Sequence, residues 1–137
     1  MSRWYLDTSA ALKLLVEEAE SAALAAAIDE AEPDLVGCYL LETELRRAAT
    51  RIDELTQQAV TLLLEGVALY DVPPALFREA GLLPGASLRS LDAIHLAAAV
   101  RLGAAELVTY DQRMRQSATE LGIPVLVPGS ENPASAD

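Results

Sequence analysis

The fold is decided by the opening stretch Arg3-Trp4-Tyr5-Leu6-Asp7-Thr8-Ser9, together with the apolar residues that follow it. Its apolar and aromatic start predicts a short strand, Asp7 to Ser9 a capped turn, and Ala10 to Glu18 a helix. The same order of strand, polar turn and helix recurs along the chain. Parallel strands need a crossover connection that is usually a helix, so this order favours a parallel sheet.

The remaining elements follow from the same signals. Helices are expected at 21–31, 39–52, 53–64, 91–102 and 111–121, strands at 35–38, 67–72, 107–110 and 123–127, and a loop at 81–87. Short strands alternating with helices predict a single α/β domain with a central, largely parallel sheet flanked by helices. We place this domain at residues 1–129 and expect a flexible acidic tail at 130–137.

Composition narrows the class of protein. The 137 residues include 10 Lys and Arg against 21 Asp and Glu, a net charge of −11 that opposes unspecific coating of nucleic acid but leaves room for a local metal-bearing site. The lone Cys38 excludes an internal disulfide and a Cys-based zinc site. Since no apolar run approaches the roughly 18 residues of a membrane span, a cytoplasmic protein without membrane contact is expected.

Two carboxylates lie on apolar faces of the expected helices. Glu44 follows Leu41 by three residues and precedes Ala48 by four, which places it within an apolar stripe. Asp92 shares a face with Leu96 in the largely apolar helix 91–102. Because an unpaired buried carboxylate is costly, each is expected to have a cation, a metal or hydrogen-bond donors nearby.

Two further carboxylates, Asp7 and Asp111, each follow an expected strand and precede a helix. In a parallel sheet both lie at the carboxyl edge, where open α/β folds bind ligands at a switch in strand order. Asp92 and Glu44 are near the starts of helices that begin at that edge, so all four are expected to face one pocket. Four carboxylates repel one another unless a divalent cation neutralises them, and oxygen ligands suit Mg²⁺ or Mn²⁺.

Each carboxylate also has a structural alternative. Asp7 and Asp111 stand where Asp commonly caps a helix. Asp92 fits an acid in the first turn of its helix, stabilised by the helix dipole. An ion pair with Arg47, three residues on, is an alternative explanation for Glu44.

Four stretches carry a resemblance to a known family. They are Tyr5-Leu6-Asp7-Thr8-Ser9-Ala10, Glu44-Leu45-Arg46-Arg47-Ala48, Leu88-Arg89-Ser90-Leu91-Asp92-Ala93-Ile94-His95-Leu96-Ala97 and Val108-Thr109-Tyr110-Asp111. In content and order they resemble the PIN-domain family and, within it, the VapC toxins of prokaryotic toxin–antitoxin pairs.

The resemblance implies that residues 1–129 form a PIN-like nuclease domain. The implied activity is that of a metal-dependent endoribonuclease using Mg²⁺ or Mn²⁺. It also implies a homodimer and a cognate antitoxin protein as partner. The implied catalytic and metal-binding residues are Asp7, Glu44, Asp92 and Asp111, and the implied supporting residues are Thr8, Ser9 and Thr109. Cys38 departs from the pattern, since relatives often have Ser six residues before the helix acid.

The basic residues and the single histidine complete the expected site. The candidates for contact with RNA phosphates are Arg46, Arg47, Arg113 and Arg115. His95 is the only histidine, and its place in an Ala-rich helix favours a packed, hydrogen-bonded structural role over that of a general base.

Two other functions compete with RNA hydrolysis. Phosphoryl transfer to an aspartate is disfavoured, because such phosphatases need a second Asp two residues after the first, where this chain has Ser9. Receiver domains need a Lys after a late strand, and the only Lys is Lys13. A non-catalytic partner-binding module with a PIN fold is the remaining alternative, and metal titration with an RNA cleavage assay distinguishes it.

Overall fold

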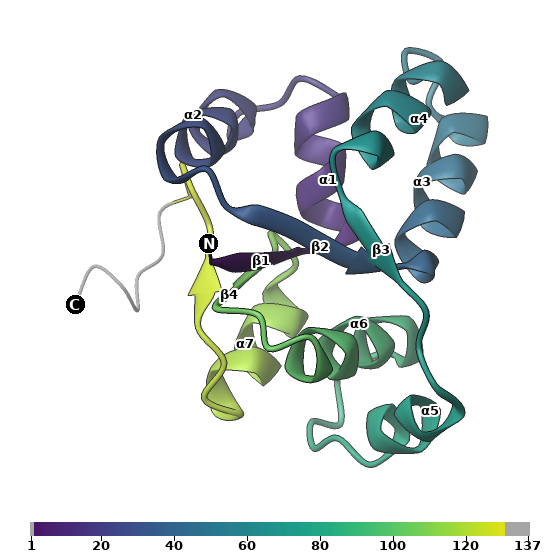
Figure 1. Ribbon diagram of the computed structural model, residues 1–137, viewed down its shortest axis with the longest axis vertical. Coiled ribbons are helices and arrows are strands. Elements are labelled where there is room, and N and C mark those ends of the chain that lie inside the picture. Colours follow the sequence, from purple (N-terminus) through teal and green to yellow (C-terminus); the bar gives the residue numbers. More distant parts are fainter. Residues whose placement is uncertain (1, 131–137) are drawn as a thin grey trace.

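Five parallel strands form the centre of the computed structural model, which describes residues 2–130 (Figure 1). They are β1 (Arg3–Leu6), β2 (Asp34–Cys38), β3 (Ala68–Tyr70), β4 (Glu106–Val108) and β5 (Val125–Leu126). Their order in the sheet is β3-β2-β1-β4-β5, and every neighbouring pair is parallel. The chain therefore builds the sheet outward from β1 in one direction and then in the other, which creates a switch in strand order between β1 and β4.

Helices cover both faces of this sheet (Figure 1). One face carries α1 (Thr8–Leu15), α2 (Ser21–Ala31), α3 (Tyr39–Arg51) and α4 (Gln57–Glu65). The other carries α5 (Pro74–Gly81), α6 (Ser90–Arg101) and α7 (Gln112–Glu120). The predicted fold class, a single α/β domain with a parallel sheet between helices, is confirmed.

The alternation of side chains along β1 divides the core in two. Successive residues of a strand point to opposite faces of the sheet. Tyr5 is buried in the cluster that contains Leu96 of α6, whereas Leu6 is buried in the cluster that contains Leu41 of α3. Cys38, at the end of β2, belongs to the same cluster as Tyr5. The strands thus present Tyr5 and Cys38 to the layer of helices that includes α6.

The helix expected at 53–64 starts later than predicted. Asp53 and Glu54 form a turn, and the N-cap is Thr56, whose Oγ1 accepts a hydrogen bond from the Ala59 amide at 3.1 Å. A threonine hydroxyl satisfies a free amide of the first helical turn, which fixes the start of α4 at Gln57.

Helix α5 is absent from the prediction. Pro74 is its first residue, a position at which the missing amide proton costs nothing because the first-turn amides have no partner within the helix. Leu76 and Ala80, four residues apart, are its buried positions. Residues 131–137 of the predicted tail lie outside the described residues. Within residues 2–130, no helix has the combination of length and apolar composition that a membrane span requires.

Candidate active site

Asp7 lies at the carboxyl end of β1 and caps α1. Its Oδ1 accepts hydrogen bonds from the Ala10 amide at 2.9 Å and the Ser9 hydroxyl at 2.8 Å, and its Oδ2 accepts one from Thr109 at 2.5 Å. The side chain is buried. Burial raises the pKa of Asp7, and these hydrogen bonds, led by that from Thr109, oppose the rise only in part. Both carboxylate oxygens are therefore already bound to the scaffold.

Asp111 caps α7 at the neighbouring strand end. Its Oδ1 accepts a hydrogen bond from the Met114 amide at 3.0 Å, so the N-cap alternative is correct for Asp7 and Asp111 alike. Thr109 joins the two acids, because its hydroxyl donates to Asp7 and accepts from the Asp111 amide at 3.1 Å. Ser9 also ties the two loops, since its hydroxyl accepts from the Tyr110 amide at 2.8 Å. The predicted supporting residues Ser9 and Thr109 thus cross-link the ends of β1 and β4.

Glu44, on α3, is half-buried and held through a single oxygen. Its Oε1 accepts a hydrogen bond from the Thr8 hydroxyl at 2.6 Å and contacts His95 Nε2 at 2.5 Å. Burial alone would raise the pKa of Glu44, but the interaction with His95 outweighs burial and lowers it. The ion pair considered for Glu44 and Arg47 is not formed, since His95 takes that place.

His95 connects Glu44 to the sheet. Its Nδ1 lies 2.7 Å from the Tyr5 hydroxyl, which in turn donates to Cys38 Sγ at 3.3 Å. The imidazole is almost completely buried. Burial by itself lowers the pKa of His95, but the neighbouring Cys38 and Glu44 outweigh burial and raise it to about 10. His95 is packed and hydrogen-bonded, as expected from the sequence.

Asp92 is an acid in the first turn of α6, as the structural alternative for it states. It makes no hydrogen bond or ion pair with any residue in the range 2–130, although it is only half-exposed. Burial raises the pKa of Asp92, and the negative charges of Asp111 and Glu44 raise it further. The fold therefore brings Asp111 and Glu44 within electrostatic reach of Asp92, and Thr109 links Asp7 to Asp111.

The described acids do not form a closed protein cage for a metal, so any cation held here would keep part of its water shell. Among residues 2–130, no three acidic, histidine or cysteine side chains are close enough together to enclose a metal on their own. Mg²⁺ keeps several waters and takes one or two carboxylates along with substrate phosphates. Asp92 has no partner of its own in the described structure and is repelled by Asp111 and Glu44. A bound cation would offset this repulsion.

Replacing Asp92 with Asn should raise the melting temperature of the metal-free protein at pH 7. The folded protein has a raised pKa at Asp92, so it binds more protons than the unfolded chain, and stability falls as pH rises above the ordinary value of 3.8. The amide removes this cost. Thermal melts in excess chelator should show a gain at pH 7 that disappears near pH 3.5, about where Asp92 is protonated in both states. An equal gain at both pH values would contradict the electrostatic cause.

The predicted phosphate-binding arginines differ in their contacts with the protein and in their exposure. Arg46 is fully engaged, since it pairs with Glu42 at 3.0 Å and donates to Gln57 at 3.2 Å and Thr61 at 3.1 Å. Its observed contacts join α3 to α4. Arg47 and Arg113 are exposed, and Arg115 is half-buried.

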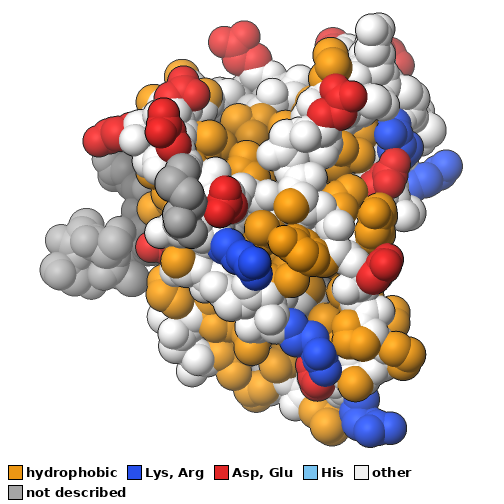
Figure 2. All heavy atoms as spheres, in the orientation of Figure 1, with side chains coloured by type: hydrophobic (Ala, Val, Ile, Leu, Met, Phe, Trp, Pro, Cys, Tyr) orange, Lys and Arg blue, Asp and Glu red, His pale blue; other side chains and the backbone are white. Residues whose placement is uncertain are grey.

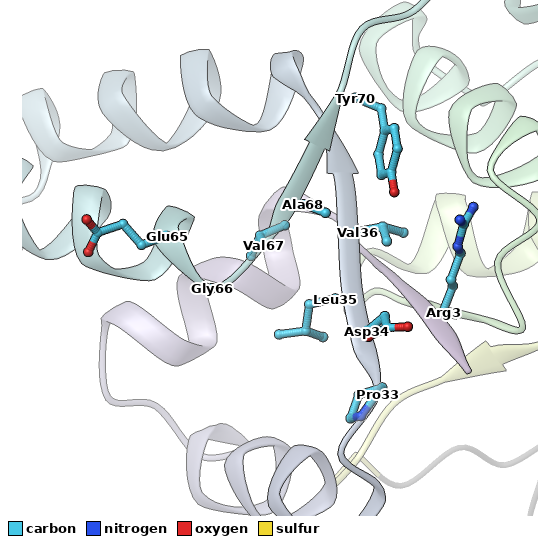
Figure 3. A pocket seen from close by; sticks show the side chains of 10 residues that line it. All are labelled: Arg3, Pro33, Asp34, Leu35, Val36, Glu65, Gly66, Val67, Ala68 and Tyr70. Carbon is cyan, nitrogen blue, oxygen red and sulfur yellow. The ribbon is translucent and has the colours of Figure 1, made fainter. Parts of the chain in front are cut away.

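A surface hollow of about 460 Å³ is lined by none of the four candidate acids (Figure 3). Its lining includes Arg3 and Asp34, the first residues of β1 and β2, so it is at the amino ends of the strands. Arg3 is already committed there, because it donates to the Leu102 carbonyl at 2.9 Å and lies 5.8 Å from the centre of the Tyr70 ring. Asp7 and Asp111 lie at the carboxyl ends of β1 and β4, at the opposite edge of the sheet. This hollow is therefore no part of the candidate site.

Comparison with known proteins agrees with this geometry. Residues 4–120 match the PIN domain, which is most of the chain. The chain belongs to the PIN-domain family. A protein of Mycobacterium tuberculosis named Ribonuclease VapC46 is 41% identical over 130 residues, covering 93% of this chain and 99% of its own. Ribonuclease VapC35 of the same species is 38% identical over 130 residues, covering 91% of this chain and 96% of its own.

A solved structure has the same fold at low sequence identity. The matching chain belongs to the crystal structure of VapBC2 from Rickettsia felis bound to a promoter DNA fragment, with a TM-score of 0.72 and 12% identity, covering 90% of this chain and 97% of that chain. The resemblance inferred from the four sequence stretches is therefore confirmed as membership of the PIN-domain family. Tyr5 and the contact between His95 and Glu44 were missed from the sequence, because 51 residues separate Glu44 from His95 and 90 separate Tyr5 from His95.

Proposed function

We propose that this chain is a Mg²⁺- or Mn²⁺-dependent endoribonuclease and the toxin of a VapBC-type toxin–antitoxin pair. The observation that carries the proposal is that Asp7 and Asp111 cap helices at the strand ends on either side of the switch in strand order, with the charges of Asp111 and Glu44 acting on Asp92. The names of its relatives, Ribonuclease VapC46 and VapC35, support RNA as substrate.

The four acidic residues would have different roles in the reaction. Asp92 and Asp111 would hold the cation, with Asp7 behind them as a buried carboxylate that is fixed by Ser9 and Thr109. When bound, a divalent cation screens the phosphodiester and lowers the pKa of a water molecule that it carries. Glu44, kept anionic by His95, would orient the attacking water. Water is thus positioned and activated by groups on four different elements.

The proposal is tested by incubating purified protein with RNA in Mg²⁺, in Mn²⁺ and in excess chelator. We expect internal cleavage with either metal and none with chelator. Cleavage in chelator would refute the metal dependence. Metal binding without cleavage of any RNA would favour the non-catalytic partner-binding module instead.

The proposed partners are a cognate antitoxin and a second copy of the chain. The VapBC2 complex of the solved structure supports the antitoxin. Large apolar side chains are exposed on the side of α5 and α6, with exposed fractions of 55% for Phe77, 77% for Leu82 and 57% for Val100. Light scattering should show a dimer, and the product of an adjacent reading frame should bind the protein and inhibit cleavage. A monomer at high concentration that the neighbour neither binds nor inhibits would refute this part.

RNA binding should depend on local arginines, because the net charge of −11 opposes encounter with an anion. On the face in Figure 2, acidic side chains gather over α2, and Lys and Arg are dispersed without forming a continuous basic surface. Changing Arg113 and Arg115 to Ala should weaken RNA binding and lower the salt slope by about one for each RNA phosphate that the protein no longer neutralises. Arg78→Ala, an exposed change on α5, is the matched control and should have little effect. Equal losses from all three changes would move the RNA path away from α7.

A further inference from the structure

A buried chain of hydrogen bonds runs from Glu44 into the sheet. It passes from Glu44 on α3 to His95 on α6, then to Tyr5 on β1 and Cys38 at the end of β2. Tyr5, Cys38 and His95 are each at most 1% exposed. The contacts join four elements that are far apart in sequence, and Glu44 is the only member of this series that is one of the four candidate acids.

In this series of hydrogen bonds from Glu44 to Cys38, each donor can be matched with an acceptor. A carboxylate only accepts, so Nε2 of His95 donates to Glu44 Oε1, and Nδ1 lies 2.7 Å from the Tyr5 oxygen. The Tyr5 hydroxyl donates to Cys38 Sγ. Every buried polar side-chain atom in the described structure has a partner, which agrees with this arrangement.

The two carboxylate oxygens of Glu44 differ in their contacts. Its Oε1 receives both Thr8 and His95, whereas Oε2 has no hydrogen-bond partner among residues 2–130. A glutamate side chain has three rotatable bonds, and anchoring one oxygen removes most of that freedom. The second oxygen stays available to a ligand.

We propose that His95 is a positioning residue, which anchors Glu44 through Oε1 and so presents Oε2 to the hydrated cation or the attacking water. This role rests on the proposed function and adds a residue to its machinery. Tyr5 and Cys38 fix the imidazole ring against the sheet, so that the position of Glu44 is set by the strands rather than by α3 alone. His95 itself touches neither substrate nor metal.

The test compares His95→Leu with His95→Gln. Leucine fills similar space without a donor, whereas the amide nitrogen of glutamine can replace Nε2 as the donor to Glu44. Groups that orient a metal ligand commonly contribute 10- to 100-fold to metal affinity or activity, so His95→Leu should lower kcat by about that factor with KM changed less than about twofold. His95→Gln should recover kcat to within about fivefold of the wild type.

A second readout needs no RNA. Calorimetric titration with Mn²⁺ should show an affinity about tenfold weaker for His95→Leu than for the wild type. In a Glu44→Ala background, the same His95→Leu change should have no further effect, because His95 acts only through Glu44. If His95→Leu does not fold, Tyr5→Phe replaces it in the same double-mutant cycle with Glu44→Ala. This change keeps His95 but removes the hydroxyl that anchors its ring, and should weaken Mn²⁺ affinity by a few fold.

Three results would overturn the role. The first is an equal kcat for His95→Leu and His95→Gln. The second is a loss of Mn²⁺ affinity on His95→Leu that persists in the Glu44→Ala background. The third applies where Tyr5→Phe is used instead, and is an unchanged Mn²⁺ affinity in that variant. The Mn²⁺ cycle separates this inference from the proposed function. A wild-type protein that binds Mn²⁺ and shows the coupling but cleaves no RNA would refute the nuclease and leave the positioning role standing.

Discussion

Replacing Asp92 with Asn will reduce Mg²⁺-dependent RNA cleavage by about 10³-fold, which corresponds to about 4 kcal/mol of transition-state stabilisation. Asp92 is the carboxylate that has no protein partner in the described structure and that experiences the charges of Asp111 and Glu44. The amide of asparagine carries no charge to balance a divalent cation, so the cation binding and water positioning proposed for Asp92 would both be lost. Single-turnover cleavage at saturating protein measures the effect directly.

The matched control is Glu54→Gln, an acid-to-amide change in the exposed turn between α3 and α4. It removes one negative charge, as Asp92→Asn does, and should leave cleavage within about twofold because exposed changes away from the site have small effects. Circular dichroism should show both variants folded. More than a tenth of wild-type cleavage in Asp92→Asn would exclude Asp92 from the metal site.

Thr109→Val will lower the free energy of unfolding by about 3 kcal/mol. Thr109 is fully buried, and valine has nearly its shape, so the change creates no cavity. What is lost is the hydroxyl that donates to Asp7 and accepts from the Asp111 amide. A buried carboxylate and a backbone amide each lose a partner, and an unsatisfied buried polar group costs about 1–3 kcal/mol.

Thr109→Ser is the control for this prediction. It keeps the hydroxyl and removes one methyl group, so it should cost about 1 kcal/mol. Urea denaturation of both variants measures the difference. If serine destabilised the protein as much as valine, packing of the methyl group rather than the bridge between Asp7 and Asp111 would be the cause.

The arrangement of strands and helices was largely predictable from the sequence because its signals are local. The strand, Asp and helix order at Asp7 and again at Asp111 identifies two strand ends that meet in a parallel sheet. Helix α5 was missed because it is short and begins at the second of two adjacent prolines, although Pro74 at a first helical position is itself a helix-start signal. The start of α4 was misplaced because Asp53 was taken as the start of the helix, whereas the N-cap is Thr56.

The placement of the acids was predictable only in part. Periodicity identified Glu44 and Asp92 as carboxylates on apolar faces, and both are indeed partly buried. Periodicity could not choose between Arg47 and His95 as the partner of Glu44, since helix spacing reveals neighbours within a helix and not across the sheet. The contacts that occupy Arg46 likewise depend on how α3 packs on α4.

The position of β1 in the sheet has a consequence for the order of folding. The first strand to be synthesised pairs with β4 about a hundred residues later, with Tyr5 opposite Leu107. The Asp7 amide also donates to the Val108 carbonyl at 3.2 Å. At 5–20 residues per second, on the order of ten seconds pass before Asp111 can join Asp7. During that time the nascent chain lacks β4 and Asp111, so its acidic centre stays incomplete until almost the whole domain has been synthesised.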